Sequence, residues 1–415
     1  MTDTSSALRS TDGVLLVCPE PLGHNHPAGV GIRFLEIARA LLADGQAVTL
    51  LSPDGGSVDG CRTGTISPEA IARASKGCRA AVVQGHIAND YFAHAADVPT
   101  AVDLYDPYIV ENLHYHRSHG PEVFEHDHAT LMRSIEKGDF FLCASSSQRL
   151  FYAGMFLAAR RIEASGFEDD PELCRLIRIV PFGVPPPRRS LPPGSNCDVL
   201  FGGIYDWYDP ILAIEAVAIA KQSMPGITLT FTRHPNPDST PQGKAAEAVS
   251  FCRDRGYGHF IRFEPWFPYS QRESFYDRYA AALLTFSASL ETDLAMRTRI
   301  FDYLWGGLPV LSSSAPGTDE IIRRYAAGTI ISSNAPEDFA AELVRILKDR
   351  SVYDPMQNGT QAYASDHQWP RLLEPLLEFC RTPWRAAAGT VETPARGALR
   401  KSVMSRIRRK LGGRP

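Results

Sequence analysis

Short apolar runs that alternate with helical segments, in two successive series, constrain this chain more than any other feature. In the first series the runs cover residues 13–19, 47–51, 80–85, 100–105, 139–144 and 177–183. The second series covers residues 197–201, 227–232, 260–263, 280–286, 308–311 and 329–332. Runs of this length suit strands that are buried on both faces of a parallel sheet. The pattern therefore predicts an α/β protein with two doubly wound sheets, in two domains that face one another.

A cluster of prolines separates the two series. Six prolines fall between residues 181 and 193, and such a composition is typical of a semi-rigid, extended linker. A chain of 415 residues is also long enough to bury two separate cores. The predicted organisation is a disordered lead-in (1–12), a first domain (13–185), a linker (186–196), a second domain (197–366), a crossing amphipathic helix (367–385) and a basic tail (386–415).

The composition excludes several classes of protein. Hydrophobic residues make up 44% and charged residues 22%, and the net charge of −4 gives no general attraction to nucleic acid. The eight cysteines form no C-x-x-C pair, no apolar stretch is long enough to span a membrane, and the first residues are unlike a signal peptide. We therefore expect a cytoplasmic protein with reduced thiols. Histidines between residues 114 and 128 lack metal-ligand spacing, so we predict a solvated loop there.

Residues 286–310 form the first candidate site, because they join two predicted strands. A loop is expected to carry Glu291 and Thr292, and a helix with Met296, Ile300 and Leu304 on its apolar face is expected to carry Arg297, Arg299 and Asp302. Ligands of open α/β sheets bind at the carboxyl ends of strands. Two cations and two carboxylates at such a place suit an anionic ligand rich in hydroxyls, such as a nucleotide sugar. Alternatively, Arg299 and Asp302 are a surface ion pair of one helix.

Glycines mark a second candidate, where the loop after the first strand meets a helix over residues 32–43. Gly29 and Gly31 would leave backbone N–H groups at the helix N-terminus for an anion or a sugar hydroxyl. The dinucleotide fingerprint G-x-G-x-x-G is absent, since position 34 is Phe, and no acidic residue ends the second strand. This weakens a dinucleotide-dependent oxidoreductase. Glycines in such loops also serve backbone geometry alone.

Acidic residues near the fourth predicted strand form a third candidate. Asp103 and Asp106 lie at its end and would either orient a hydroxyl of a substrate or cap a turn.

Four segments together resemble the GT-B glycosyltransferases, and in particular the glycosyltransferase family 4-like enzymes of bacterial surface-polysaccharide clusters. They are DLYDP (103–107), VPFGV (180–184), GGIYDWYDP (202–210) and RTRIFDYLWGGLPV (297–310). The resemblance covers roughly residues 13–380. It implies a second domain that binds the nucleotide diphosphate of the donor and a first domain that supplies the acceptor.

The resemblance also implies roles for individual residues. Asp302 matches the acidic residue that binds the ribose hydroxyls, and Glu291 is the nearest substitute for a second glutamate, because position 294 is Leu. The basic pair that many relatives place early in this domain is replaced by residues 205–208, which include Tyr205 and Trp207. Charge on the diphosphate would then be met by arginine forks and backbone amides, from Arg233, Arg297, Arg299, Gly202 and Gly203. Glu264 and Trp266 lie where relatives hold the nucleotide base.

The function that the resemblance implies is a retaining glycosyltransferase that needs no metal or other cofactor. It would use a nucleotide-sugar donor and a glycan or lipid-linked acceptor in surface polysaccharide or lipopolysaccharide synthesis, with Glu291, Arg299, Asp103 and Asp106 as catalytic candidates. A nucleotide-sugar epimerase or phosphorylase on the same fold, and a non-catalytic glycan-binding protein, remain as alternatives.

The tail offers one further partner. Residues 396–415 hold eight Lys/Arg and no acid, with Val403, Ile407 and Leu411 spaced four apart. Attraction to an anionic membrane surface would contribute about 1 kcal/mol per basic residue, so peripheral membrane contact is one expectation. A solvated tail without a partner is the other.

Overall fold

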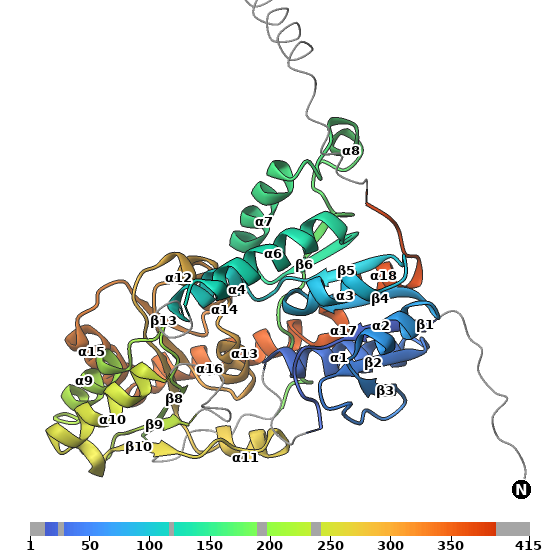
Figure 1. Cartoon of the computed structure of the whole chain (residues 1–415). Coiled ribbons are helices and arrows are strands. Elements are labelled where there is room, and N and C mark those ends of the chain that lie inside the picture. The colour runs from blue at the N-terminus through green and yellow to red at the C-terminus, as the bar shows by residue number, and fades with distance from the viewer. Residues whose placement is uncertain (1–12, 24–28, 116–119, 189–196, 234–241, 387–415) are drawn as a thin grey trace, which may run out of the picture.

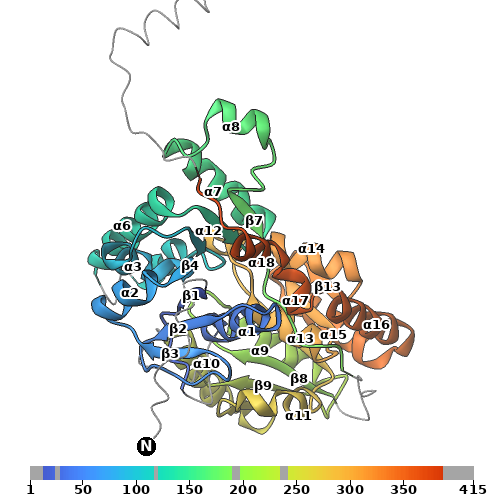
Figure 2. The same cartoon turned by 90° about the vertical axis from the view of Figure 1, so that its right-hand side faces the viewer.

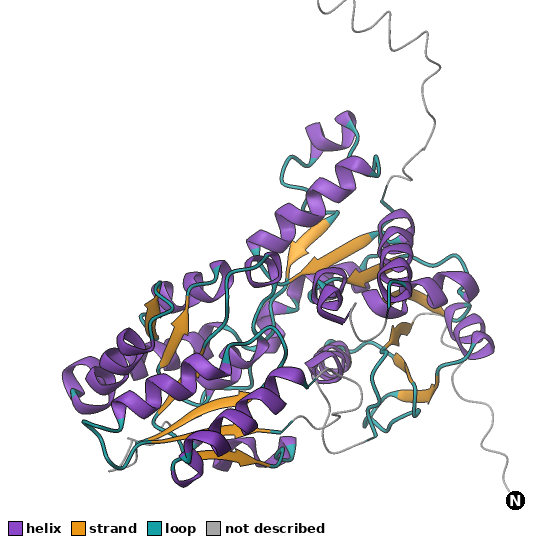
Figure 3. Cartoon of the chain, turned by 60° about the vertical axis from the view of Figure 1, so that its left-hand side comes forward, coloured by secondary structure: helices purple, strands orange, loops and turns teal. Residues whose placement is uncertain are grey.

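The computed structural model describes residues 13–23, 29–115, 120–188, 197–233 and 242–386. These residues form two domains, each a parallel sheet with helices on both faces (Figures 1 and 3). The α/β architecture predicted from the alternating pattern is confirmed. The predicted lead-in, most of the predicted linker and nearly all of the predicted tail lie outside the described residues.

The first sheet has seven strands in the order β3-β2-β1-β4-β5-β6-β7, and every neighbouring pair is parallel. Its strands are β1 (Gly13–Val17), β2 (Val48–Ser52), β3 (Arg62–Thr65), β4 (Cys78–Gln84), β5 (Thr100–Asp103), β6 (Phe140–Cys143) and β7 (Ile177–Ile179). The central strands are fully buried because helices cover both faces. These helices are α1 (Gly29–Ala43), α2 (Pro68–Ser75), α3 (Ala88–His94), α4 (Tyr108–Glu111), α6 (Glu122–Lys137), α7 (Ser146–Ala158) and α8 (Ala164–Asp169), with the 3-10 turns η1 (Gly85–Ile87) and η2 (Asn112–Tyr115).

The second sheet has six parallel strands in the order β10-β9-β8-β11-β12-β13. Its strands are β8 (Asp198–Gly203), β9 (Thr228–Thr232), β10 (Ile261–Glu264), β11 (Ala281–Leu284), β12 (Val310–Ser313) and β13 (Gly328–Ile331). Its helices are α9 (Pro210–Ala220), α10 (Gly243–Arg255), α11 (Arg272–Tyr276), α12 (Leu290–Leu294), α13 (Thr298–Trp305), α14 (Pro316–Tyr325), α15 (Pro336–Lys348) and α16 (Arg350–Asp366), with the turns η3 (Tyr257–His259) and η4 (Tyr269–Gln271). Proline at the first turn starts α9, α14 and α15, where its missing N–H costs no hydrogen bond.

The end of the described chain returns to the first domain. After a bridge between Val184 and Gln368, helices α17 (Trp369–Leu372) and α18 (Glu374–Arg381) lie between the two domains in Figure 2. The Arg79 guanidinium donates to the Cys380 carbonyl over 2.9 Å, and Arg381 forms a 2.6 Å ion pair with Asp44. Residues that come after the second domain in sequence are therefore held against the first sheet.

Several local expectations were wrong. The histidine-rich segment is not a loop throughout, because helix α6 begins at Glu122, buries Leu131 and Ile135 and carries His126 and His128. Acidic residues in the first turn favour this helix start.

Further corrections concern the candidate site. Glu291 and Thr292 belong to the short helix α12, which Ser289 caps with a 3.1 Å bond from the Thr292 amide, and Arg297 precedes helix α13. Gly202 and Gly203 are the last residues of strand β8, whereas a turn after the strand was expected, and the strand bulges between Leu200 and Gly202. Met296, expected on the helix, also lies before it.

No helix among the described residues is both long and apolar enough to cross a membrane. None of the eight cysteines forms a disulfide bond.

Candidate functional site

The carboxyl ends of the two sheets meet near one side chain, that of Gln148. Ser145 starts helix α7 by accepting the Gln148 amide, which fixes the helix at the end of β6. The Gln148 side-chain amide donates to the Tyr105 carbonyl over 2.9 Å and to the Leu294 carbonyl over 3.0 Å. Loops after β5 and after β11 are thus joined, so that polar residues from both domains face one region.

Asp103 at the end of β5 forms a closed ion pair. Arg33 from α1 reaches its two carboxylate oxygens over 2.6 and 3.0 Å, and both side chains have no exposed surface. The same guanidinium donates to the carbonyls of Pro181 and Val180 over 3.0 and 2.9 Å. This geometry leaves Asp103 no exposed oxygen for an acceptor hydroxyl. The pair instead ties α1 and the end of β5 to the residues after β7.

Asp106, three residues later, is partly exposed and belongs to a different cluster. Its carboxylate lies 3.7 Å from His86 Nε2 and shares a hydrogen bond with the Glu111 carboxyl on α4. Burial, followed by the charges of Asp106 and Glu291, raises the pKa of Glu111 well above its usual value, while Arg297 opposes the shift. A protonated Glu111 carboxyl can donate a hydrogen bond to Asp106, as in other carboxyl pairs that share one proton.

Arg297 and Glu291 face this carboxyl pair from the second domain. Their side chains are only 2% exposed and pair in a fork, with Nη2 bound to Glu291 over 2.6 Å and to the Thr292 hydroxyl over 3.2 Å. The rings of Tyr208 and Phe286 lie 5.2 and 5.1 Å from the guanidinium carbon. The Nε–H of Arg297 is buried and has no partner among the described residues. Since such a group usually binds something, it is a candidate ligand contact.

Arg299, two residues along the chain, braces the bulged end of β8. It donates to the Phe201 carbonyl over 3.2 Å and to the Gly203 carbonyl, and it lies 4.3 Å from the Tyr208 ring centre. Gly202 has φ of +78°, which favours glycine, and a β-carbon there would lie 2.8 Å from the Tyr303 hydroxyl. The bulge that brings the strand end against Arg299 therefore requires a glycine at position 202.

Asp302 lies on the same helix and is partly buried beside two other groups. Burial raises the pKa of Asp302 to about 6, although the Arg272 cation and a hydrogen bond from Tyr276 oppose this shift. Arg272 also packs 4.9 Å from the Trp305 ring centre. The surface-pair alternative for Arg299 and Asp302 is not what the structure shows, because each has its own partners.

The remaining candidates from the second domain lie around this cluster. Tyr205 and Trp207 stack with ring centres 4.9 Å apart, and Tyr205 lies 5.3 Å from the Arg299 guanidinium. A β-carbon at Gly203 would lie 3.6 Å from the Trp266 ring. These groups are therefore brought together.

Glu264 and Arg233 contribute less. Glu264 pairs with Arg278 over 2.7 Å, so its carboxylate is already engaged. Arg233 is exposed and is the last described residue before position 242.

The glycines of the first domain are not a free anion site. Gly29 and Gly31 lie in the first turn of α1, and the Glu20 carboxylate already accepts the Gly31 amide over 2.8 Å. An anion at this amide would have to displace Glu20, whose negative charge also opposes a second anion.

Three contributing groups were not predicted. The sequence analysis gave no individual site role to Glu111, Tyr208 or Arg272. Tyr208 belongs to the quoted segment 202–210, so a signal for it was present. For Glu111 and Arg272 no local pattern exists, because Glu291 acts on Glu111 and Asp302 acts on Arg272 from far along the chain.

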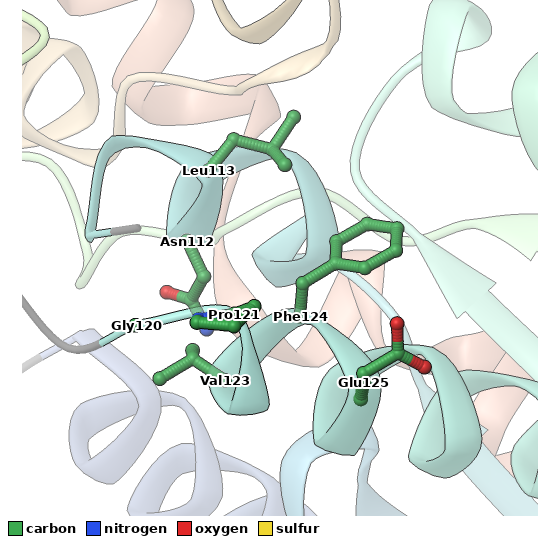
Figure 4. Close-up of a pocket in the computed structure, with 7 residues that line it drawn as sticks. All are labelled: Asn112, Leu113, Gly120, Pro121, Val123, Phe124 and Glu125. Atoms are coloured by element: carbon green, nitrogen blue, oxygen red, sulfur yellow. The ribbon is translucent and has the colours of Figure 1, made fainter. Parts of the chain in front are cut away.

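An apolar pocket of about 190 Å³ lies next to Glu111, between η2 and the start of α6 (Figure 4). It is lined by Asn112, Leu113, Gly120, Pro121, Val123, Phe124 and Glu125. Residues 116–119, which connect its two sides in sequence, are outside the described part of the chain, so we assign it no ligand. The described residues also contain no group of three or more His, Cys, Asp or Glu placed to hold a metal ion.

Comparisons with known proteins identify the fold. No protein-family model matches the chain, and no curated protein matches its sequence. Among solved structures it is similar to WaaG, a glycosyltransferase involved in lipopolysaccharide biosynthesis, with a TM-score of 0.59 and 14% identity over 89% of this chain and 100% of that one.

Two other solved structures give the same result. HepE from Anabaena, in complex with UDP and glucose, has a TM-score of 0.66 and 13% identity over 89% of this chain and 100% of that one. Sucrose-phosphate synthase from Thermosynechococcus elongatus has a TM-score of 0.61 and 12% identity over 95% of this chain and 99% of that one. Likeness at such identities concerns the fold. This chain therefore has the GT-B fold, as its four sequence segments predicted.

Proposed function

We propose that the protein is a glycosyltransferase, which moves a sugar from a nucleotide-sugar donor to a hydroxyl of a glycan or lipid-linked acceptor. The observation that carries this proposal is a cluster of two arginines opposite the carboxyl pair of Asp106 and Glu111. Arg299 binds the bulged end of β8, and Arg297 pairs with Glu291 beside it. The unpartnered Nε–H of Arg297 indicates that this cluster is incomplete without a ligand. HepE was solved in complex with UDP-glucose, which supports a nucleotide sugar as the donor class.

The second domain would bind the donor. Arginine forks and backbone amides at a strand end suit the oxygens of a diphosphate, and Arg297 and Arg299 lie at the start of α13. Asp302 would accept hydroxyls of the ribose, and the aromatic groups Tyr205, Trp207 and Trp266 would cover the base or sugar. Arg299 would act mainly by holding the β8 bulge, because its guanidinium is bonded to backbone carbonyls there.

The first domain would hold the acceptor. Asp106 and Glu111 would accept and donate hydrogen bonds with an acceptor hydroxyl that lies between the domains. We further propose retention of configuration, by attack on the same face that the diphosphate leaves. The bond from C1 to the phosphate oxygen breaks, the bond from the acceptor oxygen to C1 forms, and the acceptor proton passes to the departing phosphate. Fixed cations beside that phosphate stabilise its developing charge.

Neither a metal ion nor another cofactor is part of this proposal, because guanidinium groups supply the positive charge at the proposed diphosphate site. The proposed setting is surface-polysaccharide or lipopolysaccharide synthesis, in the cytoplasm. Its support is the likeness to WaaG, whose role in lipopolysaccharide biosynthesis is known. Contact of the basic tail with an anionic membrane stays a prediction.

A thermal-shift screen of the full chain against UDP-, GDP- and dTDP-sugars tests the donor site. A donor at 100 times its dissociation constant should stabilise the wild-type protein by about 2.7 kcal/mol. Asp302→Asn keeps the shape of the side chain but removes its charge, and we expect donor affinity to fall about tenfold, because a hydrogen bond to a charged group contributes about 1.5 kcal/mol. Asp254→Asn, on the exposed surface of α10, is the matched control and should respond like wild type.

The products then separate the alternatives. Transfer requires an acceptor, whereas an epimerase or phosphorylase converts the donor without one. Binding of a glycan with no response to any nucleotide sugar would refute the transferase and favour a non-catalytic glycan-binding protein.

A further inference from the structure

Helix α7 presents an apolar face to solvent. Leu150 is 73% exposed and Leu157 is 61% exposed, and a β-carbon at Gly154 between them would meet no atom within 4 Å. The opposite face of α7 is buried through Tyr152 and Phe156. A helix that is apolar on both faces is normally covered on both. The stripe Leu150-Gly154-Leu157 therefore lacks a partner among the described residues. Phe167 of α8, the next helix along the chain, is also 49% exposed.

The charges beside this stripe show what kind of partner fits. Residues 163–172, which include α8, hold five acidic residues and no Lys or Arg. None of the five carboxylates forms an ion pair with a described residue: Glu163, Glu168, Asp169, Asp170 and Glu172. This acidic segment would repel an anionic bilayer and attract a basic polypeptide. The stripe and the acidic segment together suit a basic, amphipathic segment of protein.

The last described residues of the chain lie close to α7 and α8. Trp384 Nε1 donates to the Arg175 carbonyl over 2.7 Å, and the Arg175 amide donates to the Asp170 carboxylate over 2.7 Å. Ala386, the last described residue, packs on the same apolar cluster as Phe151 and Met155 of α7. In both Figure 1 and Figure 2 the chain after α18 runs toward α7 and α8.

The C-terminal residues have the complementary sequence pattern. Residues 396–415 hold eight Lys/Arg and no acid, and Val403, Ile407 and Leu411 recur at every fourth position. Arg396 lies ten residues after Ala386, and a chain of that length spans at most about 33–36 Å when extended, while α7 is about 20 Å long. The basic segment is therefore within reach of the whole stripe.

We propose that the C-terminal basic segment, residues 396–415, docks on α7 of its own chain. Val403, Ile407 and Leu411 cover the stripe Leu150-Gly154-Leu157, and the Lys and Arg side chains meet the acidic segment 163–172. This proposal is independent of the proposed glycosyltransferase activity, because it uses none of the residues of the donor or acceptor site.

Limited trypsin digestion of the full chain, followed by intact mass, tests the docking, since the tail is rich in cleavage sites. In the absence of lipid, the double variant Leu150→Ser/Leu157→Ser should lose its tail about tenfold faster than wild type, because docking restricts the opening that cleavage requires. Glu168→Gln/Asp169→Asn should accelerate cleavage less, and so should 1 M salt, where the screening length falls to about 3 Å.

Val249→Ser and Asp254→Asn/Glu320→Gln, all exposed on other helices, are the matched controls. The substituted positions are exposed, so unfolding temperatures should stay within about 2 °C of wild type.

Three results would overturn the proposal. Equal cleavage of all proteins would show that the tail has no partner. Protection that appears only with vesicles containing anionic lipid would assign the tail to a membrane. Protection that disappears on dilution of the protein would assign the stripe to the tail of a second copy. Protection that is independent of concentration and lost in the stripe variant is the expected result.

Discussion

Two buried arginine–carboxylate pairs, one in each domain, differ in how completely their hydrogen bonds are made. In the first domain all three nitrogens of Arg33 have partners, namely Asp103 and the carbonyls of Pro181 and Val180. In the second domain Arg297 binds Glu291 and Thr292 through its two terminal nitrogens, and its Nε–H has no described partner. The hydrogen bonds of the first pair are therefore complete within the folded chain. The second is incomplete, and it faces a carboxyl group, Glu111, whose pKa is raised well above its usual value.

The comparison shows that burial alone does not identify a functional residue. Asp103 and Glu291 are both acidic residues after parallel strands, and both are almost fully buried against an arginine. The two pairs differ in their surroundings. The partners of Arg33 all belong to its own domain, while Arg297 lies where the two domains meet. We therefore expect substitutions at the first pair to change stability and substitutions at the second to change activity.

The largest expected effect is on stability. Asp103→Ala leaves the Arg33 guanidinium buried without its carboxylate, and breaking a buried pair in this way costs about 3–5 kcal/mol. Urea unfolding followed by intrinsic fluorescence should show this loss. Asp254→Ala, exposed on α10, should change the free energy of unfolding by less than about 0.5 kcal/mol. A small loss for Asp103→Ala would show that the pair does not hold the first domain together.

The next effect separates the two arginines by activity. Arg297→Lys keeps the charge but loses the planar fork, so kcat/KM for transfer should fall about 100-fold, as when one fixed donor to a developing charge is removed. Arg33→Lys is the matched substitution in the first domain, and the fraction that stays folded should keep the wild-type kcat/KM. Equal losses for the two variants would contradict the distinction drawn between the pairs.

The smallest effect is a difference in pH dependence. A raised pKa means that folded Glu111 keeps its proton after the unfolded chain has lost it, so wild-type stability falls as pH rises above about 4.5, the usual value. Glu111→Gln does not ionise and lacks this loss. The free energy of unfolding of Glu111→Gln, relative to that of the wild type, should therefore increase by about 1 kcal/mol per pH unit in this range.

Thermal unfolding between pH 5 and pH 8 measures this gain. Glu320→Gln, exposed on α14, is the control and should run parallel to wild type. Parallel curves for Glu111→Gln as well would show that the Glu111 carboxyl ionises normally.

Local sequence patterns determined the two sheets and much of the second domain's site. Apolar runs predict buried strands because helices cover both faces of a parallel sheet, so that side chains on both sides of a strand are buried. Strands β1, β4, β8 and β11 lie where these runs were found. The segment 297–310 also marked Arg297, Arg299 and Asp302, which lie at the start of α13 and on it. Where patterns were weak, as in the histidine-rich segment that became α6, the prediction was wrong.

Only the tertiary structure decided which charged groups are engaged and which are open. Asp103 and Asp106 are the same residue type three positions apart, yet one is enclosed by Arg33 and the other faces Glu111 and the second domain. Glu111 gains its raised pKa from burial and from Asp106 and Glu291, the latter in the other domain. Such long-range neighbours leave no local pattern, because burial and charge pairing depend on how the two domains pack. For this reason the sequence alone predicts where strands end, and the packing of the domains decides what their side chains can bind.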